Sequence, residues 1–370
     1  MTDGMPATAL PFTHREPPRG AQWDATALQM SGLEIMRAQL ERRLPEPPLT
    51  VLTGLRVSDV SLGKTTFAMP ASPWWQTGAG VFLAGTMAFV ADAPLGCAIL
   101  TGAPAGVGLA TSELSISFLR PGTIRSQMLI GRGSIIHATR SLGLSEAYVE
   151  DGRGRLLAHA TSRCVLAPIP PMAADRPARE RPSVSAAAEP APYLTPVQGE
   201  VEGQGFWDST PGIEVMRRYV SGAFVPPVFR FFGMRGVAVS DGEMTIAMPA
   251  SPWLSSALGV IYGGALALLA DATITTATAT TLPPATAFSP LDLKVNFLRP
   301  VVPHPGELVA RARIVHRGRT IAVATCEIVN AEGKTAAMAT ASVLILPGRP
   351  WDRPVYVEEE LTSTAATSSA

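Results

Sequence analysis

The stretch MPASPWLSSALGVIYGGALALLADATITTAT, residues 248–278, decides how this chain folds, because a nearly matching stretch, MPASPWWQTGAGVFLAGTMAFVADAPLG, occurs at residues 69–96. In each, a strand-like run ends in Pro-Ala-Ser-Pro-Trp, a glycine-containing turn follows, and an apolar helical segment carries one acid, Asp92 or Asp271. Matching positions differ by a constant number: 271 − 92, 299 − 120 and 316 − 137 are all 179. The sequence therefore predicts one domain duplicated in tandem.

The sequence around these stretches predicts the same elements in both copies. Apolar residues at helical spacing indicate an amphipathic helix at residues 31–44, repeated at residues 212–220. A hairpin follows, with turns near Gly63 and Gly242. After the apolar helix, strict alternation at residues 291–297 predicts a strand with one wet face, and two or three further strand candidates follow it in each copy. A helix followed by antiparallel strands, twice over, is an α+β pattern.

These patterns divide the chain into five segments. Pro-rich sequence without apolar periodicity marks the segments between and outside the copies. We expect a disordered N-terminal arm at 1–24, domain 1 at 25–167, a Pro/Ala-rich linker at 168–204, domain 2 at 205–348 and a disordered tail at 349–370.

Composition narrows the possible functions. The 370 residues are 46% apolar and carry no formal net charge, so the overall basic charge of a nucleic-acid binder is absent. Three widely spaced cysteines without a CxxC pair fit a reduced cytoplasm, and the five histidines show no metal-ligand spacing. The first residues show no secretory signal. The apolar run at 259–282 is interrupted by Asp271 and several threonines, which argues against a membrane span.

The segment YGGALALLAD, residues 262–271, resembles the HGG-x6-D helix start of hotdog-fold acyl-CoA thioesterases of the phenylacetate-pathway (PaaI-like) type, and the flanking LDLKVNFLRP and HRGRT runs fit that family. The resemblance covers roughly residues 32–167 and 212–346. It implies two tandem hotdog domains, each a long central helix wrapped by a curved antiparallel sheet. The domains would pair helix against helix with continuous sheets, forming an intrachain pseudo-dimer with acyl-CoA sites in the clefts. Further association into a homo-oligomer is also implied.

Asp271 is the candidate catalytic residue on physical grounds as well. An ionised carboxylate among leucines must meet water, hydrogen-bond donors or a ligand. Thr275 lies four residues on, on the same helical face, where its hydroxyl could hold a water. Gly263 and Gly264 would lie at the helix N-terminus, whose free N–H groups suit a thioester oxygen that gains negative charge. We expect hydrolysis of acyl-CoA to acid and CoA, with Asp271 as general base or nucleophile, without a cofactor beyond the CoA of the substrate.

Departures from the family pattern keep other interpretations open. The usual histidine before the glycine pair is Tyr262, a further candidate at the site, and the first copy has Leu83-Ala84-Gly85 there. If only one site works, we expect it at Asp271, with Asp92 kept by descent in a copy that serves as a wall. The alternative for Asp271 is a structural aspartate satisfied by neighbouring Thr or Ser hydroxyls, and the alternative for the glycine pair is close helix packing.

Polar residues near strand ends are candidates for binding the phosphates of CoA, because arginine forks suit phosphate groups. They are Arg120, Arg140, Asn296, Arg299, Arg317 and Arg319. Solvated charges are the competing interpretation. A non-catalytic acyl-CoA or lipid-binding protein is the alternative function. A hotdog hydratase is less favoured, because those enzymes resemble this fold but have His five residues after the Asp, where this chain has Cys97 and Thr276.

Overall fold

The computed structural model describes residues 11–15, 18–169 and 190–349. The first copy contains α1 (Ala25–Leu28), α2 (Gly32–Leu40), α3 (Pro48–Thr53), β1 (Arg56–Ser61), β2 (Lys64–Pro70), α4 (Gly85–Leu100), β3 (Val107–Phe118), β4 (Met128–Ala138), β5 (Leu142–Asp151) and β6 (Leu156–Pro168). The second contains α6 (Gln204–Ser209), α7 (Gly212–Val220), α8 (Pro227–Phe232), β7 (Arg235–Ser240), β8 (Glu243–Pro249), α9 (Gly263–Thr280), β9 (Thr286–Pro290), β10 (Asp292–Phe297), β11 (Glu307–Arg317), β12 (Ile321–Val329) and β13 (Thr335–Pro347). The predicted α+β architecture is confirmed in both copies.

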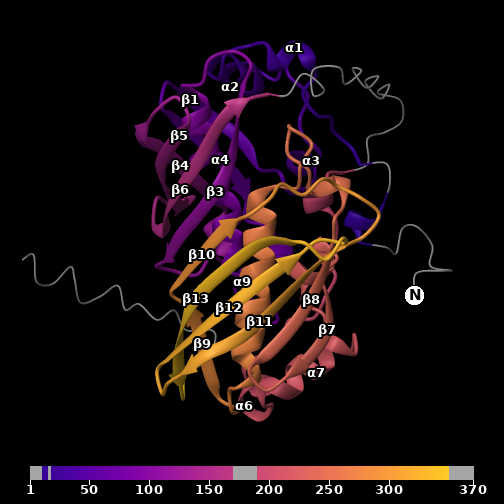
Figure 1. Cartoon of the computed structure of the whole chain (residues 1–370). Coiled ribbons are helices and arrows are strands. Elements are labelled where there is room, and N and C mark those ends of the chain that lie inside the picture. Colours follow the sequence, from indigo (N-terminus) through magenta and orange to yellow (C-terminus); the bar gives the residue numbers. More distant parts are fainter. Residues whose placement is uncertain (1–10, 16–17, 170–189, 350–370) are drawn as a thin grey trace, which may run out of the picture.

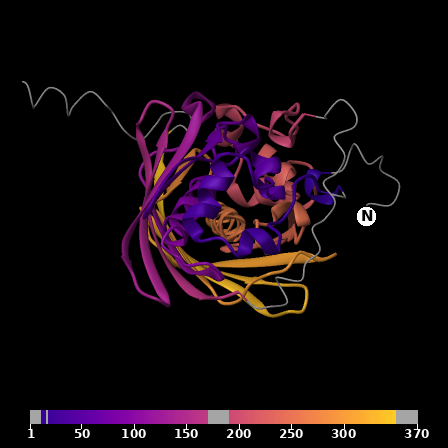
Figure 2. The ribbon, with the colours of Figure 1, turned by 90° about the horizontal axis from the view of Figure 1, so that it is seen from above.

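A single sheet runs through both copies in the order β1-β2-β4-β5-β6-β3-β10-β13-β12-β11-β8-β7, with β9 also on β13. The copies join where β3 and β10 pair antiparallel. In that pair Ser115 faces Lys294, and 294 − 115 is 179, so matching positions of the two copies face each other there. The sheet curves around the two central helices α4 and α9, which pack against each other (Figures 1 and 2). The structure is therefore a pseudo-dimer within one chain.

The central helices are buried on almost every side. In α9 all residues from Gly264 to Thr280 are buried, and several threonine hydroxyls donate to carbonyls one turn back, such as Thr273 to the Leu269 oxygen at 2.7 Å. These bonds satisfy the hydroxyls inside an apolar core. Such a helix resembles a membrane segment in composition. Even so, none of the helices in the described ranges is long and apolar enough to cross a membrane.

The expectation of a disordered arm over residues 1–24 is wrong for its described part. Phe12 packs near Phe231 of the second copy, with ring centroids 6.3 Å apart, and the Trp253 Nε1 donates to the Arg15 carbonyl at 2.6 Å. The Pro-rich composition predicted disorder, but the Phe12 ring and the Arg15 carbonyl contact side chains of the second copy. We call residues 11–15 the N-terminal strap.

The described end of the linker makes the matching contact in the opposite direction. Trp74 Nε1 in the first copy donates to the Thr195 carbonyl at 3.2 Å, and Ser72 donates to the Tyr193 carbonyl at 3.0 Å. We call residues 190–195 the linker strap. The N-terminal strap, which precedes the first copy, therefore contacts the second copy, and the linker strap, which precedes the second copy, contacts the first. The rest of the predicted linker, at 170–189, and the tail beyond residue 349 lie outside the described residues.

Candidate active site

The carboxylates of Asp92 and Asp271 each accept a hydrogen bond from the central helix of the other copy. Asp92, on α4, accepts a hydrogen bond from the Gly264 N–H at the start of α9, at 2.8 Å. Asp271, on α9, accepts one from the Gly85 N–H at the start of α4, at 2.6 Å. Both pairs obey the repeat, since 271 − 92 and 264 − 85 are both 179. The N-terminus of each central helix thus meets the acid of the other copy, a favourable charge–dipole arrangement.

This arrangement corrects the expected site. Asp271 and Gly264 are seven residues apart (271 − 264) on one helix, and at 1.5 Å per residue that separates them by about 10 Å. They therefore cannot act on one substrate carbonyl. The structure instead places Gly263 and Gly264 beside Asp92, the residue that we expected to be secondary, and leaves Asp271 beside Gly85.

The glycine pair is required by two close approaches. A Cβ at Gly263 would lie 2.9 Å from the Asp92 Oδ2. A Cβ at Gly264 would lie 2.9 Å from the backbone Cα and oxygen of Phe89 on α4. Real Cβ atoms do not come this close, so any larger residue would push the helices apart. Helix packing and the approach of Asp92 to the helix N-terminus thus depend on the same two glycines.

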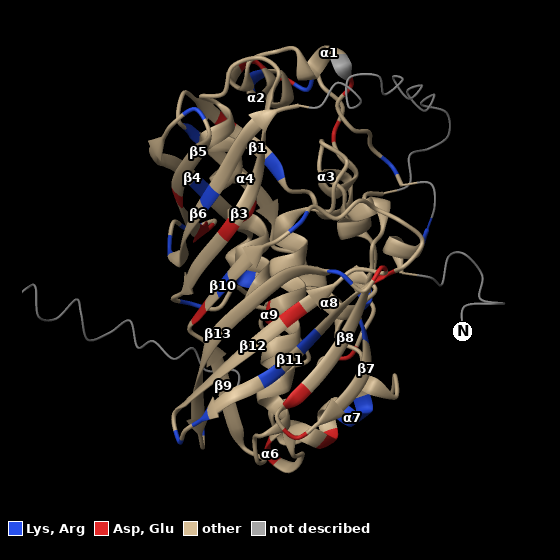
Figure 3. Ribbon diagram, in the orientation of Figure 1, with Lys and Arg blue, Asp and Glu red and all other residues tan. Residues whose placement is uncertain are grey.

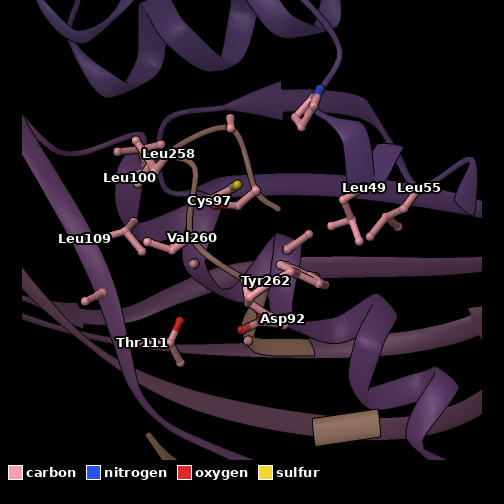
Figure 4. Close-up of a pocket in the computed structure, with 18 of the residues that line it drawn as sticks. Leu49, Leu55, Asp92, Cys97, Leu100, Leu109, Thr111, Leu258, Val260 and Tyr262 are labelled. Atoms are coloured by element: carbon pink, nitrogen blue, oxygen red, sulfur yellow. The ribbon is translucent and has the colours of Figure 1, made fainter. Parts of the chain in front are cut away.

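One carboxylate, Asp92, lines a large cavity. The cavity has a volume of about 790 Å³ and lies between the first copy and the loop and strand end at residues 256–263 and 297–301 of the second. Figure 4 shows Asp92 and Tyr262 together at the cavity wall, with Thr111 and Cys97 nearby. Asp271 is not among the residues that line this cavity, and its side chain is wholly buried, against 6% exposure for Asp92. A ligand in this cavity therefore meets Asp92.

Burial changes the proton affinity of both acids. It raises the pKa of Asp92 to about 6, although the Gly264 N–H and the Thr111 hydroxyl favour the charged form. It raises the pKa of Asp271 to about 7, against the single N–H of Gly85. The second oxygen of each carboxylate, Oδ1, is buried without a hydrogen-bond partner in the described structure. At neutral pH Asp92 is therefore a carboxylate with an unused acceptor oxygen beside a cavity.

The hydroxyls expected at the site are engaged elsewhere. Tyr262 lines the cavity, but its hydroxyl donates to the Phe89 carbonyl at 2.8 Å. The Thr275 hydroxyl donates to the Asp271 carbonyl at 2.7 Å, so its proton is used within its own helix and not for a water beside the carboxylate. Tyr262 thus positions the start of α9 against α4, and Thr275 is a structural residue.

Among the polar residues expected to bind phosphate, Arg299 lines the cavity and is exposed. The other five do not line it. Arg120 donates to the Leu156 carbonyl at 2.9 Å, and Arg317 donates to Thr281 beyond the C-terminal end of α9. The remaining three are Arg140, Asn296 and Arg319, all exposed. The structure therefore brings one of the six to the cavity.

Two cavity arginines were missed by the sequence reasoning. Arg56 forms a two-pronged ion pair with Glu46, at 2.6 and 3.0 Å. Arg42 is exposed and has a φ of 56°, where the second copy has Gly222 with a φ of 78°. A non-glycine residue with positive φ is uncommon. Comparing the copies position by position could have singled out Arg42 as an arginine at a glycine position.

The described residues contain no group of three or more His, Cys, Asp or Glu side chains that could hold a metal ion. Charges of both signs are mixed over the sheet, as in the cross-strand pairs of Arg311 with Glu327 and Arg313 with Glu243 (Figure 3).

Burial raises the pKa of Cys97, in the cavity wall, to about 12, and the nearby Asp92 charge adds to this. Cys97 is therefore a neutral thiol, the less nucleophilic form of a cysteine.

Comparisons with known proteins bear on the family and the fold. A profile of the family described as "Thioesterase superfamily" matches residues 258–337. A protein of Halobacterium salinarum named "Putative esterase" is 34% identical over 104 residues, which are 27% of this chain and 67% of that protein. One of the same name from Saccharolobus solfataricus is 28% identical over 119 residues, 32% of this chain and 83% of that protein.

A solved structure extends the likeness to both copies. The tesB protein of Mycobacterium avium subs paratuberculosis is 15% identical, with a TM-score of 0.50, and the match covers 85% of this chain and all of that one. At this identity the likeness concerns the fold, two tandem hotdog domains. The family profile and the 34% identical relative show that the chain belongs to the thioesterase superfamily.

Proposed function

We propose that this chain hydrolyses acyl-CoA thioesters in the cavity beside Asp92. The observation that carries the proposal is the unpaired Oδ1 of Asp92, which lies next to the N-terminus of α9 at the wall of a large cavity. A thioesterase needs a base or nucleophile on one side of the carbonyl and hydrogen-bond donors for the developing oxyanion on the other. The cavity wall offers both kinds of group.

In the proposed reaction, Asp92 Oδ1 takes a proton from water as the water oxygen attacks the thioester carbon. The carbon–sulfur bond then breaks and Asp92 returns the proton to the leaving sulfur, giving the acid and the CoA thiol. The Gly264 N–H already binds Asp92, so the Gly263 N–H, the first of α9, is the candidate donor to the oxyanion. Direct attack by Asp92 to form an anhydride, which water then hydrolyses, uses the same atoms. Exposed Arg42 and Arg299 at the cavity suit the phosphates of CoA.

The test measures release of free CoA thiol by wild type, Asp92→Asn and Asp271→Asn. Asn keeps the size of the side chain and an oxygen for the glycine N–H but cannot take a proton. We expect kcat/KM to fall by about 10²–10⁴ in Asp92→Asn and to stay within a few-fold of wild type in Asp271→Asn. In the wild type, kcat/KM should rise with pH through about 6, because the carboxylate form is the base. Full turnover by Asp92→Asn would refute the role of Asp92.

One observation favours a second candidate, a non-catalytic acyl-CoA-binding protein. The residue before the glycine pair is Tyr262, whose hydroxyl proton is committed to the Phe89 carbonyl, so no histidine or free hydroxyl supports the reaction there. In that case the wild type would bind acyl-CoA esters without releasing thiol from any of them.

A further inference from the structure

The same space is open in one copy and filled in the other. In the first copy the cavity extends between α2, α3, the first hairpin and α4. The matching space of the second copy holds a separate hydrophobic cluster of Val215, Met216, Phe224 and Ala279, with Phe206, Trp207, Val239 and Phe288 packed against it. The helices and strands of the two copies follow the same order, except that the counterpart of β3 is divided into β9 and β10. The side chains at this place differ in size.

Aromatic residues of the second copy replace smaller residues of the first at four positions. The alignment is fixed by matching bonds: the Gly106 N–H donates to the Leu28 carbonyl, as the Ala285 N–H does to that of Trp207. The replacements, first copy to second, are Ala27 to Phe206, Leu28 to Trp207, Leu44 to Phe224 and Leu109 to Phe288. The offset is 180 for Leu44 and Phe224, as it is for the starts of α2 and α7, and 179 for the other three. Leu109 lines the open cavity, so Phe288 adds a ring to the matching space of the second copy. Phe206, Trp207 and Phe224 belong to the same cluster as Phe288.

These rings are packed together and against the opposite copy. Phe206 stacks on Phe224 with centroids 5.6 Å apart, and Trp207 meets Phe224 edge-on at 6.3 Å. Phe224 also lies on Gly78, where a Cβ would be 2.4 Å from its ring. The counterpart of Gly78 is Ala257 (257 − 78 = 179), which lines the open cavity. The loop that leads to Asp92 thus lines the open cavity, whereas the one that leads to Asp271 is covered by an aromatic ring.

We propose that the open cavity binds one large apolar acyl chain per polypeptide, and that the cleft at Asp271 binds none. This inference rests on the proposed function for the reaction, but not for the binding. The wall of the cavity beyond Asp92 is mainly apolar, formed by Met36, Leu49, Leu55, Phe67, Leu100 and Leu109. Its volume of about 790 Å³ is in the range of sites for drug-sized ligands. An acetyl group would leave most of this apolar wall uncovered, whereas a long chain removes it from water.

The first test compares acetyl-, butanoyl-, octanoyl-, dodecanoyl- and hexadecanoyl-CoA as substrates. Each buried methylene favours binding by about fourfold, so kcat/KM should rise at up to that rate per methylene until the chain fills the cavity. If acetyl-CoA were hydrolysed with the same kcat/KM as dodecanoyl-CoA, the inference would be overturned, while the proposed thioester hydrolysis would stand.

The second test narrows the cavity with a residue from the closed copy. Leu109→Phe gives the open cavity the phenylalanine that the second copy has at the matching position, Phe288. The acyl-chain length with the highest kcat/KM should therefore become shorter. The matched control, Phe288→Leu, changes the closed cleft and should leave the profile over chain lengths unchanged. Gly96→Ala serves as a second variant, because its Cβ would meet only the Leu109 side chain at an ordinary 3.5 Å. An unchanged optimum in both cavity variants would contradict the placement of the acyl chain.

The third test separates binding from hydrolysis. Titration of the full-length protein with dodecanoate by calorimetry should give one site per chain, a site that Leu109→Phe weakens and Phe288→Leu does not. Two sites per chain, or no binding, would overturn the inference. One site without hydrolysis of any ester would support the inference and refute the proposed function alone.

Discussion

At the scale of single residues, Asp271 has a consequence that does not depend on catalysis. Its carboxyl is wholly buried, and burial raises its pKa to about 7 from an ordinary 3.8. Between these two pH values the unfolded chain loses the proton while the folded chain keeps it. The free energy of unfolding therefore falls as pH rises from about 4 to 7, and this loss is complete above pH 7.

We expect Asp271→Asn to remove this loss. The difference in unfolding free energy between variant and wild type should shift in favour of the variant by about 2–4 kcal/mol from pH 4 to pH 8. Any constant cost of burying the amide cancels in this comparison. Denaturant unfolding at the two pH values measures it. A pH-independent difference would mean that Asp271 is not protonated more readily in the folded state.

The residues of the site could be found from the sequence, but their partners could not. The repeat identified both acids and the glycine pair, because the spacing is a local property of the chain. Which acid meets which glycine depends on how α4 and α9 cross, and no pattern along one helix contains that. The helical rise alone does exclude a site formed by Asp271 and Gly264, but it does not identify the group that Gly264 meets.

At the scale of elements, the contact of α4 with α9 depends on Gly264. A Cβ there would lie 2.5 Å from the Tyr262 ring and 2.9 Å from the Phe89 backbone. Backbone atoms cannot rotate aside, so the helices must separate, and the bond from the Gly264 N–H to Asp92 would lengthen.

We expect Gly264→Ala to lower the unfolding free energy by about 1–3 kcal/mol and to reduce turnover as well. The control is Gly205→Ala on α6, where a Cβ would have no neighbour within 4 Å. That change should be neutral or stabilise by up to about 1 kcal/mol. Chemical denaturation compares the two. Equal effects of both substitutions would argue against close helix packing at Gly264.

Elements with strong periodicity were predicted well, and those without it were not. The hairpins, the central helices and β10 follow from alternation, turns and apolar runs in the sequence. The helix expected at 31–44 ends earlier, with α2 at Leu40. Short helices such as α3 and α8 escaped prediction, because each has six residues, too few to show a period. They nevertheless help to enclose the core and the cavity.

At the scale of the whole molecule, the two straps tie the copies together. Tyr193 of the linker strap packs over Gly54, where a Cβ would be 2.8 Å from its ring, and its hydroxyl accepts from Arg56 at 3.4 Å. With β3 paired to β10 as well, neither copy can unfold without exposing surface on the other.

We therefore expect one cooperative thermal transition for the whole chain. Tyr193→Ala should lower its midpoint, corresponding to a loss of about 1–3 kcal/mol for a half-buried aromatic residue, without splitting it. Leu194→Ala is the control, since that side chain is 64% exposed. Scanning calorimetry records both. Two separate transitions in the wild type would show that the copies unfold independently.

The offset of 179 that runs from the hairpin to the last strand of each copy also has an evolutionary meaning. In a dimer of identical subunits, every mutation appears in both clefts at once, so an aromatic residue that fills one would fill the other. Once the two domains are encoded in a single gene, each half accumulates its own changes. Trp207 and Phe288 could arise without harming the cleft at Asp92, and selection for binding was then free to act on one half while the other was refined for stability.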